Sequence, residues 1–519
     1  MISQQMLDQV GAMTDREFQV VLDTLFPGQE FDTAAGLQKP DIGNIRFRNG
    51  AYHAMSANDV KILVTHARAA KLRLRVAGSG HSADSAVYSQ NTDDLRIVLD
   101  GELRSVQLLS HNASGALVRV GGGCYLGKNP ADSSSTWANS LIAHLEAWGV
   151  SLPIVGGITH QSVAGFMQTS SSGGSLKYGF ANAVVEIGIV DGSSIERSLT
   201  LGSDELNAVG VGLGLFGVIT HVTLFCGPRY FVAGTEGNQE MKDSLLVKQP
   251  NGHYLLESAL ANNDYMHLNW FPQKHVSRVM QWVGQRCDEM EPFKPYDSVL
   301  RNRLMNRLAA VALRIGNLLQ GDPNNPVIEK LIGSILRPFV PLDPPKDFHD
   351  FWYRALPSDD EVDVDGAIPI QFTEIWLPVS QLTAALDRLT AAICADQGMA
   401  GNFAVELYGA KDSPFWMSPA NNRHDGVVRV DVFWWARNLG SRQRFFTHYW
   451  KQLLDLDGAR LHWGKVLPAV GQKYGNAIFG PEFIKTAYAD HITQWLHLRQ
   501  AFDPDGVFLT DYWRLIFGI

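Results

Sequence analysis

The sequence has few cysteines and no pattern that would hold a metal ion. Its four cysteines are widely scattered and lack the CxxC spacing of a zinc or redox site, so we interpret them as reduced and structural. The sixteen histidines show no HExxH motif and no paired ligand spacing. A GxSxG elbow is also missing, and Gly78-Ser79-Gly80 has the wrong spacing for one. These absences disfavour a metalloenzyme and a serine hydrolase.

The sequence also has no basic excess, and its first residues do not resemble a secretion signal. It carries 44 Lys and Arg against 53 Asp and Glu, a net charge of −9, so nucleic acid is not an expected partner. The first residues, MISQQMLDQVGAMTDREF, have neither a basic start nor an apolar core, which favours a cytoplasmic location. The longest uncharged stretch, Leu206 to Phe225, contains four glycines. It predicts buried strands and turns rather than a transmembrane helix.

What is present fits a large soluble protein with an α+β first part. The 519 residues are 45% hydrophobic and 19% charged, enough for two or three domains with a sizeable core. Ser56-Ala-Asn-Asp59 resembles a helix start, and apolar residues follow at helical spacing. Strands are predicted in LRLRVAG and LRIVLD, which end at Gly78 and Asp100.

Sheet is predicted again after residue 183. VVEIGIVDGSSIERSL indicates a hairpin around Asp191-Gly192, and VITHVTLF indicates a strand. Between them, Gly212 to Gly217 matches GxGxxG, which would suggest a dinucleotide-binding Rossmann fold if a helix followed. Because β-branched residues follow, we interpret these glycines as positions of tight turns and close packing.

The composition changes from about Tyr230 onwards, where aromatic residues become frequent, and a separate domain is expected there. Residues 301–320 and 327–337 are typical of amphipathic, basic helices. They are expected to pack on the sheet of that domain, or alternatively to form a membrane-surface or partner-binding hairpin. Near the end, AFDPDGVF predicts a Pro-Asp-Gly turn followed by a short apolar strand.

Two glycine-rich segments are candidates for binding. RVAGSGHS, Arg75 to Ser82, contains Gly78 and Gly80, which permit positive φ and close approach, so its amides are able to cradle a phosphate. His81 adds a nucleophilic, titratable ring. The alternative is a tight turn in which this histidine only forms a hydrogen bond. The second segment, Leu152 to Ser175, has few charges and many hydroxyls, a composition suited to surrounding a buried polar group.

Five motifs of the sequence follow one another in the order found in a known enzyme family. RVAGSGHS, VGGITHQSVAG, LGLFGVITHVTL, HWGK and FDPDGVF together resemble the aldonolactone and alditol oxidases, FAD enzymes of the vanillyl-alcohol oxidase type. The resemblance implies an α+β fold with a two-subdomain PCMH-type FAD-binding domain and an α+β cap domain containing an antiparallel sheet and helices. The implied domains are 1–229, with an N-terminal extension over 1–45, then 230–463 for the cap, and 464–519 returning to the FAD domain.

The resemblance also implies an FAD site. His81 matches the histidine that commonly bonds to the flavin 8α carbon, and a single link is expected because 148–154 contains no cysteine. Ser171-Ser172-Gly173 stands where the family often has Thr-His-Gly. The other matching cofactor residues are Gly78, Ser79, Gly80, Ser82, Gly156, Gly157, Ser162, Gly165, Thr169, Ser172, Gly173 and Val218.

The implied reaction transfers a hydride from a hydroxyl-bearing carbon to flavin N5 and reduces oxygen to hydrogen peroxide. Lys465, at the end of HWGK, matches a family residue beside flavin N1 and the substrate, and its cation would stabilise the reduced flavin. His462, in the same motif, is the second catalytic candidate, although a histidine beside tryptophan is equally often a core residue.

The sugar-binding residues of the family are largely replaced. Glu406 and Tyr408 stand where the family presents a glutamate and an arginine, Asp431 replaces a substrate-side histidine, and Gly157 replaces a serine. A less polar substrate is therefore expected. One of Glu406, Tyr408 and Asp431 would be the general base, unless the two carboxylates simply pair with Arg429 or another cation.

The electron acceptor has two alternatives. Gly156 matches the position that gates oxygen beside flavin C4a, and a glycine leaves this approach open, which favours an oxidase with molecular oxygen as a partner besides the small-molecule substrate. The alternatives are an aldonolactone dehydrogenase that uses another acceptor and a flavin-binding protein whose catalysis has decayed. The presence of both His81 and Lys465 argues against decay.

Overall fold

The computed structural model describes residues 39–297, 330, 333–334, 336–357, 370–401, 403–435 and 441–519. The basic helices predicted at 301–320 and 327–337 lie outside the described residues, except for a few positions of the second. Within the described part, no helix is both long and apolar enough to cross a membrane. The same residues contain no group of three or more side chains placed to hold a metal ion.

The first sheet is small, and the predicted helix packs against it. Helix α3 (Ala57–Ala70) begins at the expected residue, where Ser56 and Asp59 form a capping box. Its apolar stripe is buried in one core cluster with the strands of the sheet. The strands lie in the order β1-β2-β4-β3, and β2 and β3 both run parallel to β4. They are β1 (Phe47–Arg48), β2 (Ala51–Ala54), β3 (Leu74–Ala77) and β4 (Leu95–Leu99).

The second sheet contains the predicted hairpin. Its strands lie in the order β5-β6-β10-β8-β9, with β7 paired to β10. The hairpin of β8 and β9 turns at Asp191, as predicted. The GxGxxG segment leads directly into β10 and not into a helix, which confirms that it is not a Rossmann fingerprint. The strands are β5 (Val106–Asn112), β6 (Gly115–Gly121), β7 (Val150–Ser151), β8 (Val184–Asp191), β9 (Glu196–Thr200) and β10 (Gly217–Pro228).

One part of the 206–225 stretch differs from the expectation of strands and turns. Residues Asp204–Gly210 form helix α7, capped by the Ser203 side chain, which accepts a hydrogen bond from the Leu206 amide. The helix buries Leu206 and Val209, which are three residues apart. The Ser203 cap, which lies just before the uncharged window, and the helical spacing of Leu206 and Val209 within it therefore determined the local structure.

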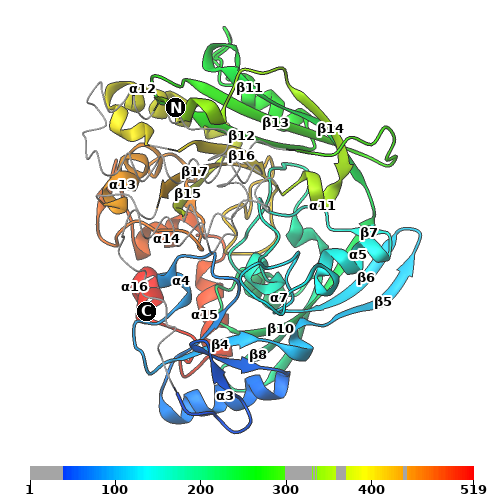
Figure 1. Ribbon diagram of the computed structural model, residues 1–519. Helices are drawn as coiled ribbons and strands as arrows, with labels where there is room; N and C mark the ends of the chain where they lie inside the picture. The colour runs from blue at the N-terminus through cyan, green and yellow to red at the C-terminus, as the bar shows by residue number, and fades with distance from the viewer. Residues whose placement is uncertain are drawn as a thin grey trace, which may run out of the picture.

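The third sheet is antiparallel, and its eight strands within the described ranges lie in the order β14-β11-β13-β12-β16-β17-β15-β18. It forms the upper part of the molecule in Figure 1. Helix α13 (Arg442–Leu453) packs on one face, where the Trp450 indole donates to Thr373 Oγ1 at 2.9 Å. The strands are β11 (Phe231–Glu240), β12 (Tyr265–Phe271), β13 (Arg278–Cys287), β14 (Lys346–Phe351), β15 (Ile370–Pro378), β16 (Val405–Ala410), β17 (Val427–Trp435) and β18 (Arg460–Leu461).

The remaining helices cover the sheets and fill the space between them. Helices α5 and α6 lie in the segment that separates the halves of the second sheet, and α12 packs on α13 beside the third sheet. The shorter helices α4, α8 and α11 precede or follow strands. Their bounds are α4 (Asp84–Val87), α5 (Leu141–Ala147), α6 (Val163–Gln168), α8 (Leu255–Asn262), α11 (Trp352–Ala355) and α12 (Leu382–Ala395).

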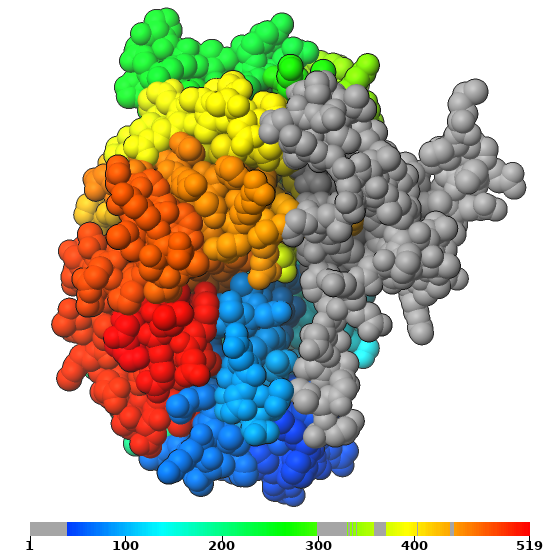
Figure 2. Space-filling model, turned by 90° about the vertical axis from the view of Figure 1, so that its left-hand side faces the viewer, coloured from blue at the N-terminus to red at the C-terminus, as the bar shows by residue number. Residues whose placement is uncertain are grey.

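The C-terminal helices return to the first part of the chain. They are α14 (Pro481–Ala487), α15 (Ile492–Phe502) and α16 (Asp511–Phe517). The Trp513 indole donates to the Ala86 carbonyl at 3.1 Å. Figures 1 and 2 show this red segment beside the blue N-terminal part.

The segment between α15 and α16 contains the predicted turn but not the predicted strand. The Asp503 carboxylate accepts hydrogen bonds from the Val507 and Phe508 amides at 2.7 and 3.0 Å, which holds the chain in a turn. The described backbone of β3 bonds to this segment through the Leu74 amide, which donates to the Val507 carbonyl. The strand prediction was therefore wrong, because a buried carboxylate took the amides that a strand partner would need. The domain limits at 229 and 463 stay a prediction.

Candidate functional site

The turn that contains His81 begins where β3 ends and requires its glycines. Gly80 has a φ of +84°, a conformation that side chains other than glycine rarely adopt. A Cβ on Gly78 would lie 2.6 Å from the Ser162 hydroxyl. Ser162 caps α6, with its hydroxyl accepting from the Gly165 amide at 3.3 Å. The two glycine-rich segments predicted from the sequence therefore meet at this point.

A cavity lies between this turn, α6 and the GxGxxG segment. Its walls are glycine backbone, hydroxyls and apolar side chains. Among the described lining residues, the basic side chains are Arg75, His81 and Arg104, the tyrosines are Tyr88 and Tyr125, and there is no carboxylate. Such a lining fits a dinucleotide with anionic phosphates. Most predicted cofactor residues line it: Gly78, Ser79, Gly80, His81, Ser82, Ser162, Gly165 and Thr169.

The other predicted cofactor residues lie elsewhere. Val218 is buried in the core of the first sheet, opposite Val190 in the strand register. Gly156 is buried and Gly157 is exposed. Ser172 and Gly173 lie at the junction with the third sheet, where the Ser172 carbonyl accepts from Arg429 Nη1 at 2.7 Å. These assignments stay predictions, and the cavity does not bring these residues together with the others.

Arg75 fixes the cavity wall and was not singled out in the sequence. The side chain is 5% exposed, and each of its five N–H donors is directed at a backbone carbonyl. Burial lowers the pKa of Arg75 to about 10, and Asp503 opposes the effect. The carbonyls belong to Ala86, Val87, Leu213, Gly214 and Phe508, so one side chain joins three segments to β3 around the cavity.

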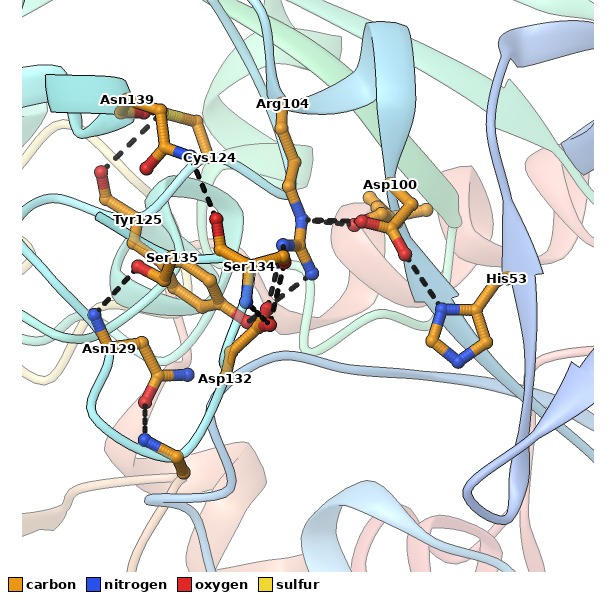
Figure 3. A network of polar contacts seen from close by, with 12 residues as sticks. His53, Asp100, Arg104, Cys124, Tyr125, Asn129, Asp132, Ser134, Ser135 and Asn139 are labelled. Atoms are coloured by element: carbon orange, nitrogen blue, oxygen red, sulfur yellow. Dashed lines mark hydrogen bonds and ion pairs between the residues drawn. The ribbon is translucent and has the colours of Figure 1, made fainter.

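A polar network holds the Arg104 side chain at another edge of the cavity (Figure 3). Arg104 Nη1 lies 2.7 Å from Asp132, and its Nε lies 3.1 Å from Asp100, which in turn accepts from His53 at 2.7 Å. Burial alone would raise the pKa of Asp132, but hydrogen bonds from Ser134 and Arg104 lower it to about 2. The network keeps a cation at the cavity edge.

The HWGK motif packs directly on the glycine turn. The Ala83 amide donates to the Gly464 carbonyl at 2.7 Å, and a Cβ on Gly464 would lie 2.9 Å from the Ser82 hydroxyl. His462 is buried, and its Nδ1 accepts from the Gly464 amide at 3.1 Å. Burial lowers the pKa of His462 to about 3, so its ring is neutral near pH 7.

Lys465 lies between the cavity and the third sheet. Its Nζ is 3.3 Å from the centroid of the Phe372 ring, a cation–π contact. Burial lowers the pKa of Lys465 to about 8, against the raising effects of Glu374 and Asp431. Burial, and then the Lys465 cation, lower the pKa of His81 to about 4, so this ring is also neutral near pH 7. The two residues are close enough to influence each other electrostatically.

The third sheet brings the remaining predicted residues together. Glu406 on β16 is the direct register partner of Asp431 on β17, which is the partner of Glu374 on β15. The Tyr408 hydroxyl donates to Asp431 Oδ2 at 2.7 Å. The face that carries these residues lies opposite the α13 face, because Glu374 alternates with Thr373. The same face carries Phe372, whose ring contacts Lys465 of the HWGK motif, and Arg429, which donates to the Ser172 carbonyl.

Arg429 pairs with a carboxylate that the sequence interpretation missed. Its Nε donates to Glu374 Oε1 at 2.5 Å, whereas its nearest approach to Asp431 is 3.9 Å. Burial would raise the pKa of Glu374, but Arg429 holds it below its usual value. Glu374 is the single charge in the apolar strand IQFTEIWLP, a signal that would have found it.

Comparisons with known proteins agree on one family. Residues 253–516, just over half of the chain, match the D-arabinono-1,4-lactone oxidase family. Mouse (Mus musculus) L-gulonolactone oxidase is 22% identical over 480 residues, covering 90% of this chain and 94% of the relative. L-gulono-1,4-lactone dehydrogenase of Mycobacterium tuberculosis is 24% identical over 454 residues, covering 86% and 90%.

The solved structure of cholesterol oxidase from Brevibacterium sterolicum has a TM-score of 0.67 at 13% identity, covering 89% of this chain and 93% of that one. This likeness identifies the fold as that of the FAD-binding oxidases. Fold and family together imply that the chain binds FAD and is an FAD-dependent oxidoreductase. The chain belongs to the D-arabinono-1,4-lactone oxidase family.

Proposed function

We propose that this protein is an oxidase that takes a hydride from a hydroxyl-bearing carbon and reduces oxygen to hydrogen peroxide. The observation that carries the proposal is that Lys465 lies between the cofactor cavity and the charged face of the third sheet. On one side is a cavity without carboxylates that suits FAD, and on the other is a sheet face bearing buried charged groups. Bound there, FAD would supply the hydride acceptor.

We propose that His81 anchors the flavin through a single covalent bond. A neutral imidazole has a nucleophilic lone pair, and the depressed pKa of His81 keeps it available near pH 7. The bond replaces one hydrogen of the flavin 8-methyl group and the proton of the imidazole nitrogen, with oxygen as the oxidant. The backbone of Gly78 to Gly80 and the hydroxyls of Ser162 and Thr169 would hold the rest of the cofactor.

The substrate would lie between the flavin and the third sheet. Lys465 would orient and polarise its hydroxyl, and Glu406 is the proposed acceptor of the hydroxyl proton. Tyr408 and His462 would position these groups, because the Tyr408 hydroxyl already donates to Asp431 and His462 Nδ1 already accepts from Gly464. The Phe372–Phe433 ring pair, with centroids 5.2 Å apart, supports a substrate less polar than a simple alditol.

A dehydrogenase with a different electron acceptor is the second candidate, favoured by the name of the mycobacterial relative. Gly156 supports the oxidase, because it matches the family position that gates oxygen beside flavin C4a and a glycine has no side chain to block the approach. Reducing the enzyme without oxygen and then admitting oxygen separates the two. Rapid reoxidation of the flavin is expected, and reoxidation only by an artificial acceptor would favour the dehydrogenase.

Acid precipitation of the purified protein tests the cofactor. The yellow chromophore is expected to stay with the protein and to map to the His81 peptide, whereas H81A should release it as free FAD. Free FAD from the wild type would refute the covalent bond alone. Peroxide formation is then measured across sugars, lactones, aryl alcohols and hydroxylated natural-product precursors. No peroxide from any of them would contradict the oxidase.

A further inference from the structure

Three carboxylates form a row across adjacent strands of the third sheet. Glu406, Asp431 and Glu374 are direct register partners on β16, β17 and β15, and their side chains share one face. Like charges directly opposite each other destabilise a sheet. Asp431 is the middle member, so it has a carboxylate neighbour on both sides. It is the member that gains most from being neutral.

The position of the Arg429 cation also indicates that Asp431 is the neutral member of the row. Arg429 directs its three nitrogens at Glu374, the Ser172 carbonyl and the Tyr408 hydroxyl. Glu374 Oε1 also accepts from the Trp376 indole at 2.6 Å. Glu374 is therefore stabilised as an anion by a direct charge-assisted bond, whereas Asp431 has no cation within hydrogen-bonding distance among the described residues.

The two oxygens of Asp431 have different surroundings. Oδ2 accepts from the Tyr408 hydroxyl, whose oxygen in turn accepts from Arg429 Nη2 at 2.6 Å, so the direction of this chain is fixed. Oδ1 is buried, and no donor or acceptor of the described residues bonds to it. Asp431 is only 1% exposed. An ionised carboxylate in this position would be costly, and a proton on Oδ1 removes that cost.

In the part of the chain that the structure describes, the charged and titratable groups that face Asp431 are Glu374, Glu406, Tyr408, Arg429 and Lys465. Burial, and then the Glu374 charge, raise the pKa of Asp431 well above its usual value, and Arg429 and Lys465 only partly oppose them. The electrostatics therefore agree with the hydrogen-bond geometry.

We propose that Asp431 is a neutral carboxylic acid in the resting protein and that its Oδ1 hydroxyl donates a hydrogen bond to an acceptor oxygen of the substrate. The substrate half of the proposal rests on the proposed function. Asp431 is then a specificity residue and not the base. The site would then favour a substrate with an acceptor oxygen beside the reacting hydroxyl over a simple alcohol.

Infrared spectroscopy of the holoenzyme tests the protonation state without any substrate. The difference spectrum between wild type and D431N at neutral pH is expected to contain a carboxylic-acid carbonyl band that shifts in D2O. The matched variant E406Q should keep the band. Its absence from the wild type, or its persistence in D431N, would overturn the proposal. Circular dichroism and the flavin absorption spectrum establish that each variant has folded.

Steady-state kinetics test the substrate half. D431N can still donate a hydrogen bond from its amide, so its KM is expected to stay within about tenfold of the wild-type value. D431L has no donor, so its KM should rise further, while its kcat should fall by less than about tenfold. Loss of a general base would instead lower kcat of D431N by about 10² or more and remove the acidic limb of the pH profile. That result would refute a neutral Asp431. If no substrate is oxidised, the proposed function fails while the infrared result still stands.

Discussion

The cofactor cavity and the face of the third sheet each contain a buried arginine, and the two guanidinium groups are stabilised by different kinds of hydrogen-bond acceptor. Arg75 donates to five backbone carbonyls, whereas Arg429 donates to a carboxylate, a carbonyl and a hydroxyl. The pKa of Arg75 falls to about 10 mainly through burial, while carboxylate partners raise the pKa of Arg429 above its usual value despite burial. The cavity is built from backbone dipoles and the sheet face from paired charges.

This difference determines how each region responds to a change. Backbone carbonyls remain when a side chain is replaced, so a substitution in the cavity should remove only the hydrogen bonds of the replaced side chain. The charges of the sheet face depend on each other, so removing one leaves another buried and unpaired. The larger effects are therefore expected on the sheet face.

E374Q should have the largest effect on stability, because it leaves Arg429 buried without its carboxylate. We expect the free energy of unfolding, measured in urea, to fall by about 3–5 kcal/mol. The matched control is E196Q, which breaks the exposed Lys61–Glu196 pair and should cost less than about 1 kcal/mol. Equal losses in the two variants would show that the Arg429 pair contributes no more than a surface ion pair.

The same contrast explains what the sequence predicted well. The glycine turn, α3, the β8–β9 hairpin and the GxGxxG segment are local, and their residues are neighbours in the chain. Glycine spacing, a capping box and a turn dipeptide act within a few residues, so a pattern is enough to predict them. Most of the cofactor residues implied by the family resemblance line one cavity, although this cavity joins the Gly78–Ser82 turn to Ser162 and Thr169, which no local pattern relates.

The sheet face was harder to predict because strand register joins distant residues. Arg429 and Glu374 are 55 positions apart, and no local pattern indicates which carboxylate the arginine will pair with. The expected alternatives were Glu406 and Asp431, and the structure pairs Arg429 with Glu374. The Asp132–Arg104 contact was missed for a related reason, because it depends on a loop folding back over 28 residues.

K465M tests whether the cation between the two regions acts in the reaction. We expect kcat/KM to fall by about 10²–10³, because a preorganised charge is lost where charge develops. FAD content should stay unchanged, since Lys465 does not line the cavity. K465R keeps a cation and should retain more activity. A K465M enzyme within tenfold of the wild type would remove Lys465 from the proposed mechanism.

The pH profile gives a smaller and graded test of the same residue. A lysine with a pKa of about 8 is a cation below that pH and neutral above it. The wild-type kcat/KM should therefore fall above about pH 8, by about tenfold per unit. In K465R the fall should move to higher pH, because a guanidinium stays protonated. An unmoved limb would assign the titration to another group.

R104Q should have the smallest effect, because it removes one cation from a cavity built mainly of backbone. In the H81A background, where FAD is held without a covalent bond, we expect the dissociation constant of FAD to rise about tenfold, since a hydrogen bond to a charged group contributes about 1.5–3 kcal/mol and water replaces part of it. The control is R119Q, whose partly exposed arginine pairs with Glu186 and does not line the cavity.

The comparison of two ligands locates the effect of Arg104 within the cavity. Riboflavin lacks the phosphates of FAD, so its affinity should be the same in H81A and in H81A with R104Q if Arg104 acts on the anionic half of the cofactor. An equal loss for both ligands would show instead that the Asp132 network supports the cavity wall as a whole. The backbone-built region would then depend on paired charges in the same way as the sheet face.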